Sequence, residues 1–164
     1  MATTITPSDF TANITDNITL NTRDFGSSST YVRTECTEAD QRIVKVALKA
    51  GAEEVQTWTT LFNYGTANAA GTGITTEFQY VRLTNLDDTN YCIVQFVMQT
   101  SHNRFNIKLG PYESFMLQDN AAVALCVEGP EVGYTAFSTI KTIQAAADTA
   151  ACDVEIVTVF KPAL

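Results

Sequence analysis

The sequence predicts an all-β protein: an antiparallel β-sandwich of jelly-roll type, preceded by an extended N-terminal arm. Thr, a β-branched residue that fits the pleated surface of a sheet, accounts for 25 of the 164 residues. Apolar and polar residues alternate with a period of two in many short stretches, which is the pattern of half-buried strands. Turn-forming residues separate these stretches at short intervals, and no stretch predicts a helix of ordinary length.

The chain divides into an arm and one domain. Residues 1–13 are small and polar and are expected to form the arm, whereas residues 14–164 are expected to form a single β-sandwich domain, because regular alternation begins at Ile14. Residues 26–29 (GSSS) predict a loop, and residues 37–40 predict either one helical turn or a polar loop. Strands are expected at residues 14–21, 31–36, 42–48, 55–62, 77–84, 91–100, 104–109, 114–118, 121–127, 139–146 and 152–160.

The clearest pattern lies between residues 77 and 118. Four expected strands follow one another here through short polar turns, which predicts an antiparallel meander. The residues expected to be buried in the core are Val81, Leu83, Val94, Phe96, Ile107 and Leu117.

Several strands carry apolar residues on both faces. In a β-sandwich one face of a strand packs into the core and the other meets water, so a second apolar face needs a covering loop or a partner chain. We therefore expect a homo-oligomer, with a trimer favoured over a dimer, or a chain embedded among other proteins. Val157 and Val159 are the first candidates for the contact, because the polar alternation of Asp153 and Glu155 stops just before them. The complete set of candidate interface residues is Phe78, Tyr80, Tyr91, Ile93, Val157 and Val159.

The composition argues against several classes of partner. The formal net charge is -8, so neither nucleic acid nor an anionic membrane surface is an expected partner. Residues 1–10 lack the basic and apolar regions of a signal peptide, and the longest apolar run, residues 121–127, is too short to cross a bilayer. We therefore expect the chain to fold in the cytoplasm.

The four cysteines are expected to be reduced residues of the core. All lie in or beside apolar stretches, where a free thiol behaves as a small hydrophobe. None belongs to a C-x-x-C pair and the chain has one His, so no structural zinc site is predicted. Two disulfides are the alternative, and they would require an oxidising compartment. These residues are Cys36, Cys92, Cys126 and Cys152.

No catalytic, cofactor-binding or metal site is predicted, and the chain is not expected to be an enzyme. A Ser-His-Asp triad would have to use His102, for example with Ser114 and Asp119, but there is no G-x-S-x-G elbow and Ser114 belongs to an expected strand. Acids such as Glu77 and Glu113 are scattered along the chain and cannot be paired into a glycosidase dyad.

Residues 85–90 (NLDDTN) carry clustered oxygen ligands of the kind that Ca²⁺ prefers. Their spacing matches no EF-hand loop, and Asn and Asp are common turn residues. Asn85, Asp87, Asp88 and Asn90 therefore predict a hairpin turn.

A resemblance to a known family runs through five segments. They are residues 80–87 (YVRLTNLD), 91–95 (YCIVQ), 108–117 (KLGPYESFML), 140–146 and 154–160. Together they resemble the small accessory virion proteins of tailed phages, in which a strand ending in Thr-Asn turns through acidic residues and a later strand opens after a Gly-containing turn. The resemblance covers about half of the chain and implies a β-sandwich, oligomers and no catalysis; it carries over no functional residue.

The resemblance implies a structural protein of a phage particle, assembled in the host cytoplasm and located in the virion. The first expectation is a capsid decoration or cement subunit that contacts itself and other phage structural proteins, and a tail, neck or fibre-attachment subunit is the near alternative. A carbohydrate-binding β-sandwich module is the alternative from another class. It would need exposed aromatic residues, for which the candidates are Trp58, Tyr64, Tyr80 and Tyr112.

Overall fold

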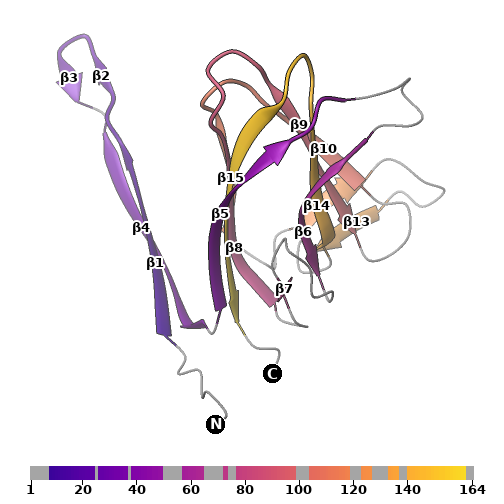
Figure 1. The fold of residues 1–164 in the computed structure, drawn as a ribbon. Helices are drawn as coiled ribbons and strands as arrows, with labels where there is room; N and C mark the ends of the chain where they lie inside the picture. The colour runs from indigo at the N-terminus through magenta and orange to yellow at the C-terminus, as the bar shows by residue number, and fades with distance from the viewer. Residues whose placement is uncertain are drawn as a thin grey trace.

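The computed structural model describes residues 8–24, 26–36, 38–49, 57–64, 72–73, 77–98, 104–118, 123–126, 133–136 and 140–161. Every regular element among them is a β-strand, and antiparallel sheets pack in two layers. The predicted all-β sandwich is therefore confirmed. Figure 1 shows the sandwich on the right and a long hairpin that stands apart from it on the left.

Two sheets make the sandwich. The first has four antiparallel strands in the order β11-β8-β15-β5, which are β11 (Ser114–Leu117), β8 (Glu77–Asn85), β15 (Cys152–Lys161) and β5 (Glu38–Val46). The second has five strands in the order β10-β9-β14-β6-β7, which are β10 (Arg104–Leu109), β9 (Cys92–Met98), β14 (Ile140–Ala147), β6 (Thr59–Tyr64) and β7 (Thr72–Gly73). Only the short pairing of β6 with β7 is parallel among the described ladders.

The predicted meander is wrong. β8 and β9 follow each other in the chain but lie in different sheets, and so do β10 and β11. Of these four strands, only β9 and β10 are neighbours in both the chain and a sheet. Alternation shows which face of a strand is buried, but it does not show which strand lies beside it. The apolar faces of β8 and β9 therefore meet across the core instead of within one sheet.

The N-terminal segment forms a hairpin. β1 (Ser8–Asp16) pairs with β4 (Ser27–Cys36), and β2 (Thr19–Leu20) pairs with β3 (Arg23–Asp24) at the tip. Residues 8–13 were expected in the arm, but they belong to β1. The loop expected at residues 26–29 is wrong for Ser27–Ser29, which pair with Asp16, Thr15 and Ile14 as part of β4. The sequence did not indicate this strand, because serines add no apolar signal.

The helical turn or polar loop expected at residues 37–40 is also wrong where the structure describes it. Residues 38–40 open β5, where Ala39 pairs with Val159 and Asp40 pairs with Thr158. A further pair, β12 (Val123–Cys126) with β13 (Gly133–Ala136), lies outside the two main sheets. Residues 1–7, 37, 50–56 and 65–71 lie outside the described part of the chain, so parts of the expected arm, turns and loop at these positions are untested.

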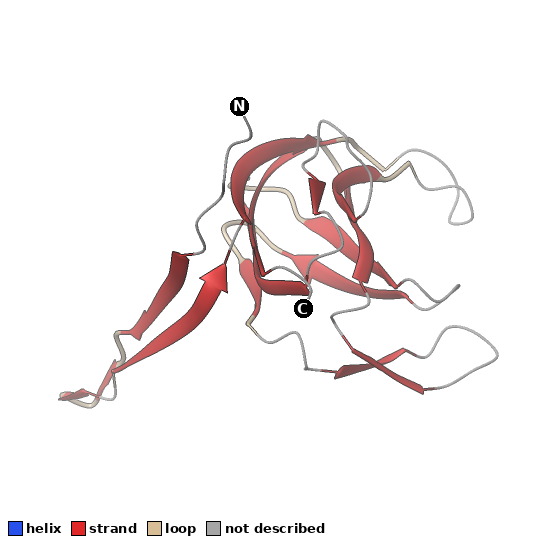
Figure 2. Ribbon diagram, turned by 90° about the horizontal axis from the view of Figure 1, so that it is seen from below, coloured by secondary structure: helices blue, strands red, loops and turns tan. Residues whose placement is uncertain are grey.

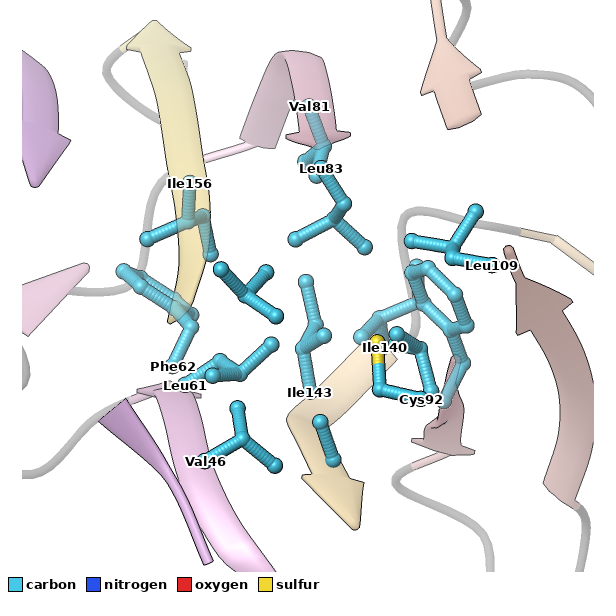
Figure 3. Close-up of a cluster of buried hydrophobic side chains, with 14 of the residues drawn as sticks. Val46, Leu61, Phe62, Val81, Leu83, Cys92, Leu109, Ile140, Ile143 and Ile156 are labelled. Atoms are coloured by element: carbon cyan, nitrogen blue, oxygen red, sulfur yellow. The ribbon is translucent and has the colours of Figure 1, made fainter. Parts of the chain in front are cut away.

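The core lies between the two sheets. Figure 3 shows Val81, Leu83 and Ile156 of the four-stranded sheet pointing toward Ile143 and Phe62 of the five-stranded sheet. Aromatic pairs extend the core, with Phe62 stacked on Phe160 at 5.2 Å and Phe96 stacked on Phe105 at 4.5 Å between ring centroids. Of the six residues expected in the core, five are buried and Ile107 is half-buried; the five are Val81, Leu83, Val94, Phe96 and Leu117.

Three of the cysteines are buried, which confirms the expected burial for Cys36, Cys92 and Cys152. Burial raises the pKa of the Cys92 thiol to about 12, with smaller contributions from Cys152 and Asp87. The side chain of Cys126 lies outside the described residues.

Candidate functional site

The hairpin of residues 8–36 is the feature that distinguishes this chain from a bare sandwich. Figures 1 and 2 both show it leaving the body as a narrow two-stranded ribbon. β1 alone extends for about 30 Å at the usual rise per residue. The hairpin therefore reaches well beyond the body that carries it.

The tip of the hairpin is a two-residue turn. Leu20 pairs with Arg23, and the residues between them, Asn21 and Thr22, have φ of 51° and 63°. Two central residues with positive φ are typical of a type I′ turn, whose twist matches that of the flanking strands. Below the tip, a Cβ on Gly26 would lie 2.5 Å from the backbone oxygen of Asp16, so this position requires glycine.

The base of the hairpin is fixed to the outer face of the four-stranded sheet by an apolar cluster. We call it the anchor cluster, and it consists of the buried residues Cys36, Tyr80 and Val159 with the half-buried Phe10, Ala12, Tyr31 and Val157. The rings of Phe10 and Tyr80 lie 4.8 Å apart, and the hydroxyl of Tyr31 donates a 2.9 Å hydrogen bond to the backbone oxygen of Gln79. Burial raises the pKa of Tyr80, and the nearby charge of Arg82 opposes the shift. The cluster holds only the lower part of the ribbon.

Beyond the anchor cluster the hairpin is open to solvent. The side chains of Ile18 and Leu20, near the tip, are 51% and 61% exposed. An isolated two-stranded hairpin is marginally stable in water at best. Since each strand of the pair also has one edge without a described neighbour, the distal half offers both apolar side chains and unpaired backbone groups for binding.

The anchor cluster buries two of the candidate interface residues. Tyr80 and Val159 are 4% and 1% exposed in the single chain, and the chain's own hairpin covers them. The apolar outer face of β8 and β15 does need a cover, as the sequence indicated, but the chain's own hairpin supplies it. The ladder between β15 and β8 has a register shift between Val159 and Phe160. This shift lets these two consecutive residues both be buried.

The other candidate interface residues have mixed positions. Val157 is half-buried at the margin of the anchor cluster. Tyr91 and Ile93 are half-buried; the ammonium of Lys108 lies 3.8 Å from the centroid of the Tyr91 ring, and a hydrogen bond with Asp148 raises the pKa of Tyr91. The side chain of Phe78 lies outside the described residues. The six candidates therefore do not form one surface.

The remaining outer face of the four-stranded sheet is mostly polar. The guanidinium of Arg82 lies 2.7 Å from the carboxylate of Glu155, and Gln41 donates to the same carboxylate at 2.8 Å. Two apolar residues interrupt this face, Ile43 at 62% and Met116 at 38% exposure. They are single residues among polar neighbours, and scattered exposed apolar residues are normal on a protein surface.

The acidic segment at residues 85–90 is a structural turn, although it does not close a hairpin. It carries the chain from β8 in one sheet to β9 in the other, so the predicted hairpin is wrong. One carboxylate oxygen of Asp87 accepts hydrogen bonds from the backbone N–H groups of Thr89 and Asn90, and these bonds lower the pKa of Asp87.

Asn85 joins this turn to the next one. Its side chain is fully buried, and its amide nitrogen lies 2.8, 3.2 and 3.0 Å from the backbone oxygens of Asn90, Leu109 and Gly110. Its side-chain oxygen accepts the N–H of Asp87 at 3.1 Å. Asn85 therefore fixes two loops that each cross between the sheets.

Within the described ranges, no group of three or more His, Cys, Asp or Glu side chains could hold a metal ion, and no helix is long and apolar enough to cross a membrane. His102 and Asp119, two members of the triad considered above, lie outside those ranges, as does the side chain of Glu77. Comparison with protein-family models, with curated proteins and with solved structures finds no match for the chain. The hairpin and the sandwich are therefore the observations on which a function can be argued.

Sequence reasoning missed this hairpin and its packing onto the four-stranded sheet. The signal was present as two aromatic residues, Phe10 and Tyr31, in segments with few other large apolar residues. Both now contact Tyr80 in the anchor cluster.

Proposed function

We propose that this chain is a structural subunit of a tailed-phage particle, with a capsid decoration or cement subunit as the first possibility and a tail, neck or fibre-attachment subunit as the alternative. The hairpin of residues 8–36 carries the proposal. A ribbon that leaves its own domain, with exposed apolar residues along its distal half, is suited to binding a neighbouring subunit. The proposal includes no catalytic activity.

The strand order supports the proposal, because it fits a jelly roll. β5 pairs with β15, β6 with β14, β8 with β11 and β9 with β10, so the early strands pair with the late ones in nested order. Jelly rolls, which are two-sheet folds of eight strands, occur in viral capsid domains, in lectins and in cupins. Because one fold hosts several functions, the strand order supports the proposal without selecting it.

The carbohydrate-binding alternative has less support. Tyr80 is buried in the anchor cluster and Trp58 is half-buried, whereas Tyr112 is 68% exposed. The side chain of Tyr64 lies outside the described residues. A sugar platform needs several exposed aromatic faces together, and the described candidates do not provide them.

The proposal is tested in particles of the phage that encodes the chain. Mass spectrometry of purified particles should detect the protein at a fixed copy number. Replacing Ile18 and Leu20 by Asp should lower that copy number at least tenfold without unfolding the protein, because both residues are exposed on the hairpin and an apolar contact would be lost.

The matched control replaces Tyr112, an exposed residue of the sandwich, by Asp. This variant should enter particles at the wild-type level. Absence of the wild-type chain from the particles would overturn the proposal. Equal incorporation of the Ile18→Asp, Leu20→Asp variant would show that the hairpin tip is not the binding element.

A further inference from the structure

The outer edge of β1 is an unpaired strand edge. β1 has nine residues and pairs with β4 alone among the described strands, so the backbone groups along its other edge have no strand beside them. β4 is less available, because Tyr31 and Arg33 of β4 contact the sandwich through the oxygens of Gln79 and Gln118. At the base of the hairpin, Figure 2 shows β4 between β1 and the sandwich.

The middle of β1 lacks the usual protection against edge pairing. Exposed edge strands are commonly guarded by Lys, Pro, inward charges or a strong twist. From Phe10 to Thr15 the strand has no charged residue and no proline, and the irregularity of its ladder is confined to the end between Ser8 and Phe10. An uncharged edge with a regular ladder is suited to pairing with another strand.

The sequence of β1 is complementary to itself when two copies run antiparallel about Ala12. Phe10 then lies opposite Ile14, and Thr11 lies opposite Asn13. Asp9 lies opposite Thr15, so no carboxylate faces another carboxylate. Directly opposite residues on one face are the pairs that stabilise an antiparallel sheet, and like charges at those positions destabilise it.

We propose that β1 pairs edge to edge with β1 of a second copy of this chain, about a two-fold axis at Ala12. The two hairpins then form one four-stranded antiparallel sheet in the order β4-β1-β1-β4. One face of this sheet joins the half-buried Phe10, Ala12 and Ile14 of both copies into a continuous apolar strip. This pairing overcomes the marginal stability of a two-stranded ribbon, because three or more strands with an apolar face are stable.

The inference rests on the proposed function, since it gives the assembling subunit a second contact, between two copies of this chain, besides the contact proposed for Ile18 and Leu20 of the distal half. A two-fold contact is isologous and produces a dimer or an assembly built from dimers. It therefore differs from the trimer expected from the sequence, and the two can be separated by mass.

The register is tested by cross-linking. In the proposed pairing Ala12 faces Ala12 of the second copy, and opposite Cα atoms in an antiparallel pair lie about 4.5–5.5 Å apart, within the span of a disulfide. Under mild oxidation by a thiol–disulfide reagent, Ala12→Cys should form a covalent dimer through loss of two thiol protons and two electrons to the reagent. Thr15→Cys is the control, because its two copies would lie about 20 Å apart.

The edge is tested by charge. Thr11→Lys with Asn13→Lys brings lysines opposite one another in the proposed dimer and should raise the dissociation constant by about tenfold or more. The matched control is Thr30→Lys with Val32→Lys. These residues pair with Asn13 and Thr11 on the same face of the hairpin but lie on β4, so the control should dimerise like the wild type.

Light scattering and non-reducing gel electrophoresis then give distinct outcomes. A wild-type dimer, cross-linking of Ala12→Cys alone and loss of dimer only in the β1 lysine variant support the proposal. A trimeric mass, equal cross-linking at both positions or equal effects of the two lysine variants would overturn the β1 pairing. These results would still leave the chain as a protein that assembles with itself. A monomer that still enters particles overturns the β1 pairing alone, whereas a monomer absent from particles overturns the proposed function as well.

Discussion

Replacing Asn85 by Ala should lower the free energy of unfolding by about 3 kcal/mol. The amide nitrogen of Asn85 lies within hydrogen-bonding distance of three backbone oxygens, and its two hydrogens supply two donations among them. The side-chain oxygen accepts one more bond, from the N–H of Asp87. Three hydrogen bonds of this buried side chain, at about 1 kcal/mol each, give the expected loss, since alanine leaves their partners unsatisfied.

Urea unfolding at fixed protein concentration measures the loss. With a slope near 2 kcal/mol per molar urea, the midpoint should fall by about 1.5 M. The matched control is Asn13→Ala, which removes one exposed side-chain hydrogen bond to Thr30 and should cost no more than about 0.5 kcal/mol. A loss below about 1 kcal/mol for Asn85→Ala would refute the view that this residue fixes the two loops.

Asn85→Asp adds a pH dependence. The new carboxyl would face backbone oxygens from a buried position, so its folded pKa should rise above the ordinary value of about 3.9. Because the folded state then favours the protonated form, this variant should lose stability as pH rises above about 4. A destabilisation that does not change between pH 4 and pH 7 would contradict the geometry.

Three further outcomes check other parts of the structure. Phe96→Ala should cost about 3–5 kcal/mol in the same urea assay, because the ring is fully buried and stacked on Phe105; a loss below about 1 kcal/mol would mean that the strand face is inverted. Tyr31→Phe removes the hydrogen bond to Gln79 and should lower the free energy of unfolding by about 1 kcal/mol. The change should also speed amide hydrogen exchange in β1 and β4. Unchanged exchange would show that the hairpin base is held by other contacts. The Cys92 thiol should resist thiol reagents at pH 8 in the folded protein, because its pKa is raised to about 12, and should react once the protein is denatured; fast labelling of the native state would contradict its burial.

The sequence predicts the strands well where apolar residues alternate with polar ones. The bounds expected for β10, residues 104–109, are those observed, and β8, β11, β14 and β15 each end one residue before or after the expected position. The strand at residues 27–29 was missed, because a run of serines has no apolar face and is recognised only by the partner strand that it meets. The pattern of side chains thus indicates which strands are buried, and it does not indicate strands that lie outside the core.

The sequence also did not predict which strands lie beside each other in a sheet. The alternation in β8 and β9 is correct, yet the two strands lie in different sheets, because a short turn can equally close a hairpin or cross a sandwich. Asn85 decides this case through bonds to Leu109 and Gly110, more than twenty residues away in the chain. The apolar outer face of β15 was recognised as needing a cover, but no local pattern shows that the cover comes from Phe10 and Tyr31 of the same chain.

The claim that this subunit assembles through its hairpin is tested most directly by cryo-electron microscopy of purified particles. We expect density for the sandwich at a regular position in the particle, with the hairpin of residues 8–36 in contact with a neighbouring chain along its distal half. Density for the sandwich with a hairpin surrounded by solvent would contradict the claim, and so would particles that contain no copy of the chain.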